Sequence, residues 1–194
     1  SFIVKNDSNG NGLLEAGETA DLGIVLNNIG NEIAVGLKGV LTTTNDKLVI
    51  NNTEADFNSI GDDASAVALF NVTLAENAGN NIKLPLEVTV SDAFNNVYNF
   101  EGTYKNACEV IFELYDAGGD GWNGAALVVK YSDGTPEEAF TILDGDSRTI
   151  KRKINNDVEI SLSWVKGSWD LENSFIIKNE NDNVIYRNGG LIDK

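Results

Sequence analysis

Apolar and polar residues alternate along most of the 194-residue chain, in short runs separated by clusters of Asn, Asp and Gly. A period of two is typical of β-strands with one buried face, and no stretch has a convincing helical period. In the first half these runs predict strands at 2–5, 21–27, 33–43, 47–50, 66–74, 82–91 and 97–104. Pro85 interrupts one of them and predicts an edge or a bulge there. Such a series of short strands favours an immunoglobulin-like (Ig-like) sandwich.

The second half continues the alternation and predicts strands at 108–115, 125–131, 138–143, 148–154, 158–165, 174–178 and 184–186. A polar step at Tyr104-Lys-Asn-Ala107 separates the two series. We therefore expect two domains, residues 1–104 and residues 105–194. The predicted fold class is all-β, with two tandem antiparallel β-sandwiches, Ig-like and then jelly-roll-like.

Composition narrows the function. Hydrophobic residues make up 42% of the chain, enough for real cores, and the formal net charge is -16. This charge repels phosphates and anionic lipids, so we expect no nucleic-acid partner. No run approaches the roughly 18 apolar residues of a membrane span. The chain contains no histidine, which excludes His-dependent triads and His-ligated zinc or iron.

The chain also lacks methionine, and no charged and then apolar leader precedes Phe2. We expect a monomeric piece of a longer protein. Abundant Asn and Asp without structural disulfides suit a secreted or cell-surface bacterial protein. Cys108 is the one cysteine and is predicted to be a small buried residue at a strand start.

One loop carries the chemistry of the second half: Asp116-Ala-Gly-Gly-Asp-Gly-Trp-Asn-Gly124. Glycines let the backbone fold tightly, and Asp116, Asp120 and Asn123 offer the hard oxygen ligands that Ca²⁺ prefers. Because Ca²⁺ takes about six to eight oxygens, a remote donor is needed, and Asp170 or Glu172 is the best candidate. The alternative is that these carboxylates cap glycine turns or stay solvated and hold no ion.

The first half contains a second loop of this kind, Asp7 to Glu18. It fits the EF-hand pattern, with Gly12 at the sharp turn. Ligand positions one, three, five, seven and twelve are Asp7, Asn9, Asn11, the carbonyl of Leu13, and Glu18. Strand patterns flank it in place of helices. The alternative is an ion-free Asx and Gly turn, although such a turn needs no glutamate at position twelve.

Trp122 and Trp169 lie in or beside loops and suggest carbohydrate binding, because aromatic faces stack on sugars. The alternative is core packing, which the alternating strand at 158–164 predicts for Trp164. A glycoside hydrolase could use Asp120 and Glu172 as its two carboxylates, but calcium-type spacing explains both better as ligands.

Residues 108–187 resemble the "DSYGDGWNG" β-sandwich of secreted and surface proteins of Bacteroidetes. A later "G-x-x-D-x-E-x-S-F" segment of that module is matched by Gly167, Asp170, Glu172, Ser174 and Phe175. The chain departs from the pattern in two ways: Ala117-Gly118 stands for Ser-Tyr, and the flanking cysteines are reduced to Cys108.

The first half is similar to the Ig-like "D-x-N-x-N-G-x-L-E-x-G-E" modules of the same proteins, including those C-terminal to gingipain-like cysteine peptidases. The resemblance implies a non-catalytic, calcium-stabilised accessory or adhesion module of a larger surface protein, whose parent could be a peptidase. The expected partners are Ca²⁺ and a glycan or a host or cell-surface protein.

Overall fold

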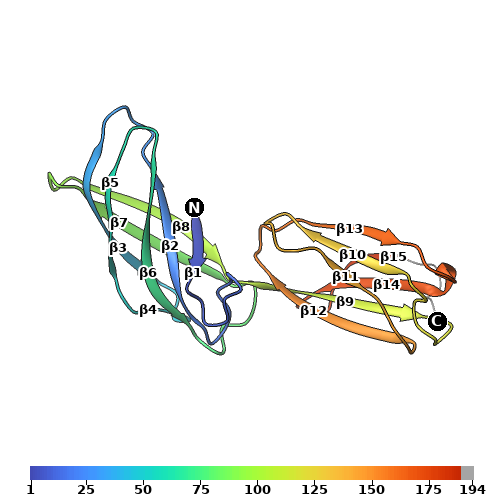
Figure 1. Cartoon of the computed structure of the whole chain (residues 1–194). Helices are drawn as coiled ribbons and strands as arrows, with labels where there is room; N and C mark the ends of the chain where they lie inside the picture. Colours follow the sequence, from blue (N-terminus) through green and yellow to red (C-terminus); the bar gives the residue numbers. More distant parts are fainter. Residues whose placement is uncertain (189–194) are drawn as a thin grey trace. The chain divides into compact units, whose positions relative to one another are not determined.

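The computed structural model describes residues 1–188, and these form antiparallel sheets almost throughout (Figure 1). The chain divides into two compact units, Ser1–Ala107 and Cys108–Lys194. The boundary lies three residues after the one expected from the sequence. The predicted fold class, all-β with two tandem antiparallel β-sandwiches, is confirmed.

Unit 1 is built from two four-stranded sheets. The first has the order β1-β2-β6-β4, with bounds Phe2–Lys5, Thr19–Asn27, Ser65–Leu74 and Leu48–Ile50. The second has the order β5-β3-β7-β8, with bounds Glu54–Ile60, Ala34–Thr43, Lys83–Ser91 and Val97–Lys105.

Alternation along the strands accounts for the core of unit 1. In β7, Leu84, Leu86, Val88 and Val90 are buried while Glu87 faces solvent. Each fully buried side chain of this size stabilises the fold by roughly 1.5–3 kcal/mol relative to exposure. The same pattern in the neighbouring strands gives one continuous hydrophobic core.

Two details depart from or refine the predicted strands. β5 was not predicted, because Glu54–Ile60 mixes Asp, Asn and Ser with only a few apolar residues. Pro85 lies in β7 beyond the last pair with β3, Thr43↔Leu86, so its missing N–H removes no bond to β3. β7 is an interior strand and its register with β8 runs through Pro85 without a shift, so the predicted edge or bulge is not found.

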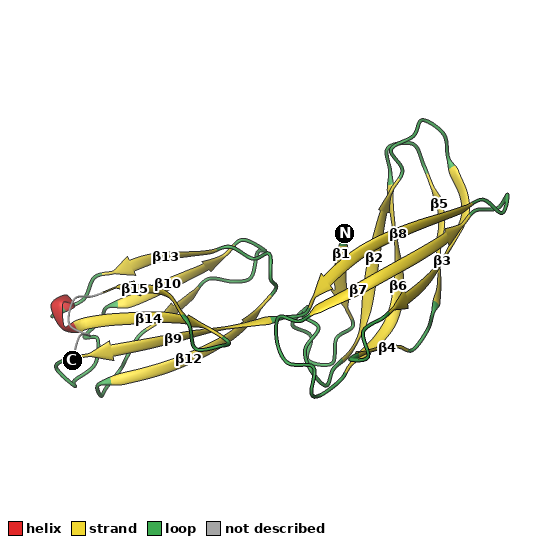
Figure 2. Cartoon of the chain, turned by 180° about the vertical axis from the view of Figure 1, so that it is seen from behind, coloured by secondary structure: helices red, strands yellow, loops and turns green. Residues whose placement is uncertain are grey.

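Unit 2 packs a four-stranded sheet on a three-stranded one (Figure 2). The larger sheet has the order β12-β9-β14-β15, with bounds Ser147–Ile154, Cys108–Asp116, Asn173–Asn179 and Val184–Asn188. The smaller has the order β11-β10-β13, with bounds Glu138–Phe140, Ala126–Tyr131 and Ile160–Val165. A short 3₁₀ turn, η1 at Asp170–Glu172, precedes β14.

Three loops meet at the end of unit 2 where β9 ends. Backbone hydrogen bonds tie the loop after β9 to the other two: Trp122 N to Ile142 O at 2.8 Å, and Ala117 N to Glu172 O at 3.0 Å. A parallel bridge also joins Asp120 to Gly145. Residues 117–125, 141–146 and 166–172 are thereby held against one another.

An ion pair on unit 2 makes its stability depend on pH. Arg152 donates from Nε to Glu138 Oε2 at 2.8 Å and from Nη2 to Oε1 at 2.7 Å, and Tyr131 OH donates to Oε2 at 2.8 Å. The hydrogen bonds from Arg152 lower the pKa of Glu138 below its usual 4.5. A lowered carboxyl pKa stabilises the fold above the usual pKa, and this contribution is lost as the pH falls through the lowered value.

We therefore expect Glu138→Gln to destabilise unit 2 near neutral pH by up to about 1 kcal/mol, since both side chains are about one third exposed. The difference from the unsubstituted chain should shrink as the pH falls below about 4. Urea unfolding of both chains across this range measures it. A constant difference at all pH values would contradict the assignment.

Candidate metal centre

Asp116 is the last residue of β9 and only 5% exposed, unusual for a carboxylate. Its Oδ2 accepts hydrogen bonds from the backbone N–H of Asp120 and of Gly121, each at 3.0 Å. Its Oδ1 is buried and has no hydrogen-bond partner among the described residues. A buried carboxylate oxygen without a partner is costly, and a water or a cation at Oδ1 would remove that cost.

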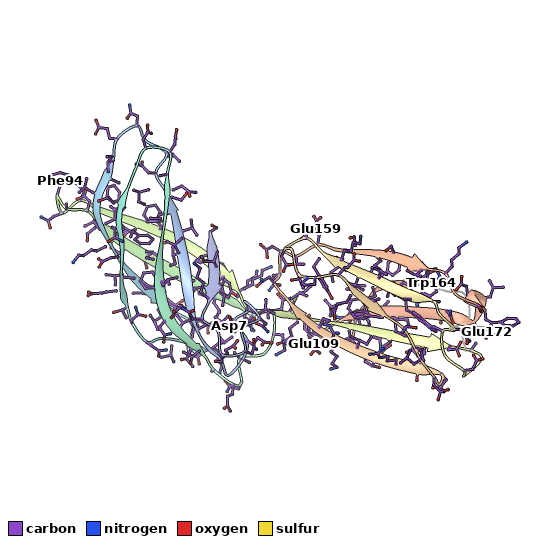
Figure 3. The ribbon with its side chains drawn as sticks, viewed as in Figure 1. Asp7, Phe94, Glu109, Glu159, Trp164 and Glu172 are labelled. Atoms are coloured by element: carbon purple, nitrogen blue, oxygen red, sulfur yellow. The ribbon has the colours of Figure 1, made fainter. Side chains whose placement is uncertain are left out.

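Asp120 and Glu172 complete an acidic cluster with Asp116. One carboxylate oxygen of each residue lies within 4.8 Å of the others, and no other such group occurs in the described part of the chain. Figure 3 shows Glu172 at the end of unit 2 where the loops meet. A Cβ on Gly118 would collide with Glu172 Oε2 and lie 3.2 Å from Asp120 Oδ1. Gly118 therefore leaves the room that the Glu172 carboxylate occupies.

This arrangement fits a hard divalent cation. Three carboxylates at such distances repel one another, and each would be attracted to a cation bound between them. All the side-chain donors are oxygens, as Ca²⁺ prefers, and carbonyls and waters would supply the rest of about six to eight ligands. The unpartnered Oδ1 of Asp116 is the atom that such an ion would satisfy.

Two other predicted ligands are not among these three carboxylates. Asn123 Nδ2 donates to Asp120 Oδ1 at 2.9 Å and to Gly121 O at 2.9 Å, so it orients the Asp120 carboxylate, and its own Oδ1 stays a predicted ligand atom. Asp170 Oδ1 accepts from Gly167 N at 3.0 Å and caps that turn. Of the two predicted remote donors, the structure brings Glu172 to the loop and leaves Asp170 outside the group of three carboxylates.

Asn123→Gly should isolate the orienting role of Asn123. Its φ of 48° is a left-handed conformation that glycine adopts without strain, so folding without Ca²⁺ should be unchanged. Loss of a partner that orients a ligand costs roughly 10–100-fold in metal affinity. Titration calorimetry with Ca²⁺ measures this. Unchanged affinity would contradict the role, and a lower melting temperature in EDTA would show a fold defect instead.

Trp122 is core, which corrects its prediction as a ligand-binding residue. Its side chain is fully buried, and its indole N–H donates to Tyr115 O at 2.9 Å. The ring centroid lies 5.0 Å from that of Trp164, which stacks on Phe175 at 6.4 Å. Trp122 therefore forms the hydrophobic floor below the acidic cluster and offers no face to a sugar.

Trp169, in contrast, is 70% exposed and directly precedes η1. Its φ of 62° is in the left-handed region, which is sparsely populated for residues other than glycine and common at functional sites. Glu172 N donates to Trp169 O at 2.9 Å, so the same turn carries an exposed indole and a carboxylate of the cluster. Trp169 remains available for a ligand.

The loop Asp7 to Glu18 joins β1 to β2 and is closed by hydrogen bonds within it, but its acidic side chains form no convergent group of three among the described residues. Asp7 Oδ2 and Asn9 Oδ1 both accept from Asn11 N, at 2.7 and 3.0 Å, and Asn11 Oδ1 accepts from Leu13 N at 2.9 Å. Glu18 is buried, and its two carboxylate oxygens accept backbone N–H groups of the loop at 3.2 Å. Gly12 has φ 74° at the predicted sharp turn.

Glu15 is a candidate ligand that the sequence reasoning missed. Its Oε2 accepts from Asn9 Nδ2 at 2.6 Å and from Asn11 Nδ2 at 3.1 Å. Counting from Asp7, Glu15 holds the ninth position, which in EF-hands often binds through water. That spacing was readable from the sequence and would have identified it.

The chain is thus an all-β protein of two units, and the loops at one end of unit 2 bring together side chains that offer only oxygen atoms to a ligand. No family model matches the chain, and no curated protein matches it. Among solved structures it is similar to domains D2 and D3 of the major pilin SpaD from Corynebacterium diphtheriae, with a TM-score of 0.31 and 11% identity over 93% of this chain and 82% of that one. A likeness this weak carries no functional argument. No helix in the described residues has the length and apolar character needed to cross a bilayer.

Proposed function

We propose that the chain is a non-catalytic, Ca²⁺-stabilised accessory or adhesion module of a secreted or cell-surface multidomain bacterial protein. The observation that carries this proposal is the buried, unpartnered Oδ1 of Asp116 beside the Asp120 and Glu172 carboxylates. The loop motifs support the wider context: proteins of Bacteroidetes, including the regions C-terminal to gingipain-like peptidases.

The mechanism is ion-linked folding. A cation held by Asp116, Asp120 and Glu172 would tie the end of β9 to η1, two segments far apart in the sequence. Since the unfolded chain does not bring these oxygens together, the ion stabilises the folded unit by RT ln(1 + [Ca²⁺]/Kd). This is about 2.7 kcal/mol at a hundredfold excess over Kd. Calcium outside the cell would then rigidify the unit after export.

Thermal unfolding in millimolar Ca²⁺, Mg²⁺ and EDTA tests the proposal. For a unit of this size, Ca²⁺ should raise the melting temperature by roughly 10–20 °C at such an excess. Mg²⁺ should raise it less, because it demands near-ideal octahedral geometry and keeps its waters. Equal melting temperatures in Ca²⁺ and EDTA would sink the proposal.

A second candidate function is Ca²⁺-dependent carbohydrate binding, favoured by the exposed Trp169 beside the acidic cluster. A glycan array probed in Ca²⁺ and in EDTA tests it. Trp169→Ala should abolish any specific signal, and an array without signal would reject this function.

The glycoside hydrolase alternative requires turnover that Asp120→Asn or Glu172→Gln abolishes. In a glycoside hydrolase the two carboxyl groups flank the sugar and lie about 5–9.5 Å apart. Asp120 and Glu172 instead converge with a third carboxylate, that of Asp116.

A further inference from the structure

We infer that the open edge of β8 in unit 1, with the groove beside it, docks an extended strand of a partner protein that is apolar at alternate positions and basic between them. This surface is separate from the acidic cluster and does not depend on a bound ion. Nine residues, Val97–Lys105, form β8, and their only strand partner in the described structure is β7.

β8 differs from the other edge strands. Its register with β7 runs without interruption from Lys83↔Lys105 to Ser91↔Val97. The remaining edges of the described sheets, β1, β4, β5, β11, β12, β13 and β15, are all shorter. β5 pairs with β3 through two register shifts, and β12 carries Arg148, Lys151, Arg152 and Lys153. Short length, irregular pairing and positive charge protect an edge from further pairing, and β8 has none of these along its middle.

The exposed end of β8 is apolar. Val97 is 61% exposed, Tyr98 47% and Phe100 45%. Tyr98 and Phe100 lie on the same side of the strand as the buried Tyr104, since they are separated from it by even numbers of residues. Side chains that would face the core in a fully covered strand are therefore left in contact with solvent.

A groove of about 780 Å³ runs beside these side chains. It is lined by the end of β2 with Val25 and Leu26, by the loop 28–33 that follows β2, and by Phe94, which Figure 3 places at the tip of a loop of unit 1. One wall thus belongs to each sheet of the sandwich. An apolar groove bordered by an unpaired strand suits an extended peptide, because backbone hydrogen bonds supply affinity and alternate side chains fill the groove.

β1 shows that this side of the sandwich accepts a strand. β1 adds to β2 from Phe2↔Ile24 to Lys5↔Asp21. The Phe2 ring covers Gly102, where a Cβ would lie 2.8 Å from it, and its centroid is 5.9 Å from that of Tyr104. The Phe2 ring of β1 therefore covers Gly102 and Tyr104 of β8, while Phe100 and Tyr98, earlier on the same face of the strand, line the groove.

Charge decides between a basic partner and a second copy of this chain. The two charged residues that line the groove, Glu32 and Asp92, are both acidic, and the whole chain carries -16. A second copy would bring the same negative charge to the interface, whereas a strand with lysine or arginine between its apolar residues is attracted.

The test uses the full chain and a labelled synthetic peptide that spans the length of β8, with valine alternating with lysine or threonine. Fluorescence anisotropy near physiological salt measures affinity, and amide hydrogen exchange locates the peptide. We expect saturable binding and slowed exchange in β8. Phe100→Ser should weaken binding about tenfold or more, while Val49→Ser, an exposed apolar residue of β4 in the other sheet, should not.

Two further peptides distinguish strand pairing from simple attraction to an acidic protein. Both have the same charge, and each is N-methylated at every second residue, one at the odd positions and the other at the even positions. A paired strand donates from one set only, so one of the two must lose binding. Equal binding of both, equal loss in the two protein variants, or slowed exchange away from β8 would overturn the inference. Sedimentation showing a dimer that Phe100→Ser dissociates would overturn it in favour of a second copy.

Discussion

Asp116→Asn is expected to remove the Ca²⁺-dependent stabilisation of unit 2, about 2.7 kcal/mol at a hundredfold excess of Ca²⁺ over Kd. The asparagine oxygen can still accept from the N–H groups of Asp120 and Gly121, so the loop keeps its two backbone bonds. The amide nitrogen takes the place of Oδ1, a donor where the cation needs an oxygen. Unfolding monitored in Ca²⁺ and in EDTA measures the loss.

Asp170→Asn is the matched control, since Asp170 is a nearby aspartate whose carboxylate caps a turn. It should keep the full difference between Ca²⁺ and EDTA. Loss of that difference in both variants would indicate a general effect of negative charge at this end of the unit. Its survival in Asp116→Asn would refute the proposed site.

Trp122→Ala is expected to destabilise unit 2 by about 3–5 kcal/mol, with or without Ca²⁺. The indole is the largest fully buried side chain of the chain, and its removal leaves a cavity against Trp164 and an unpaired Tyr115 carbonyl. Urea unfolding followed by signals from each unit measures it. The transition of unit 1 should not move, since Trp122 belongs to the separate core of unit 2.

Trp169→Ala serves as the comparison, because its side chain is mostly exposed. It should change stability by no more than about 0.5 kcal/mol. A large effect of Trp169→Ala together with a small one of Trp122→Ala would contradict the assignment of one tryptophan to the core and the other to the surface.

The strands were largely predictable because alternation reports directly which face is buried. The exception, β5, shows the limit of that signal. Its residues Phe57 and Ile60 are buried, but Asp56, Asn58 and Ser59 between and beside them are typical of turns. Packing of Phe57 against the core outweighs those local preferences.

The site was predictable where the ligands lie in one loop and less so where a second segment contributes. Asp116 and Asp120 follow from the glycine-rich loop itself. Asp170 and Glu172 are both acidic and two residues apart, and the sequence does not decide between them. The 3₁₀ turn places them differently: Asp170 caps Gly167, and Glu172 reaches the loop.

Trp122 was ambiguous for a different physical reason. A loop position usually means exposure, but this loop folds back over the open end of the sandwich, where Trp164 and Phe175 form the core. Tertiary packing determines which tryptophan is buried, and the local pattern of residues around each loop does not show it.

The most direct test of the central claim is carboxyl ¹³C NMR during titration of the EDTA-treated chain with Ca²⁺. The account predicts saturable shifts of the Asp116, Asp120 and Glu172 carboxyl carbons along one binding curve, while the Asp170 carboxyl carbon stays constant. Shifts confined to other carboxyls, or no saturable shift in the cluster, would contradict it.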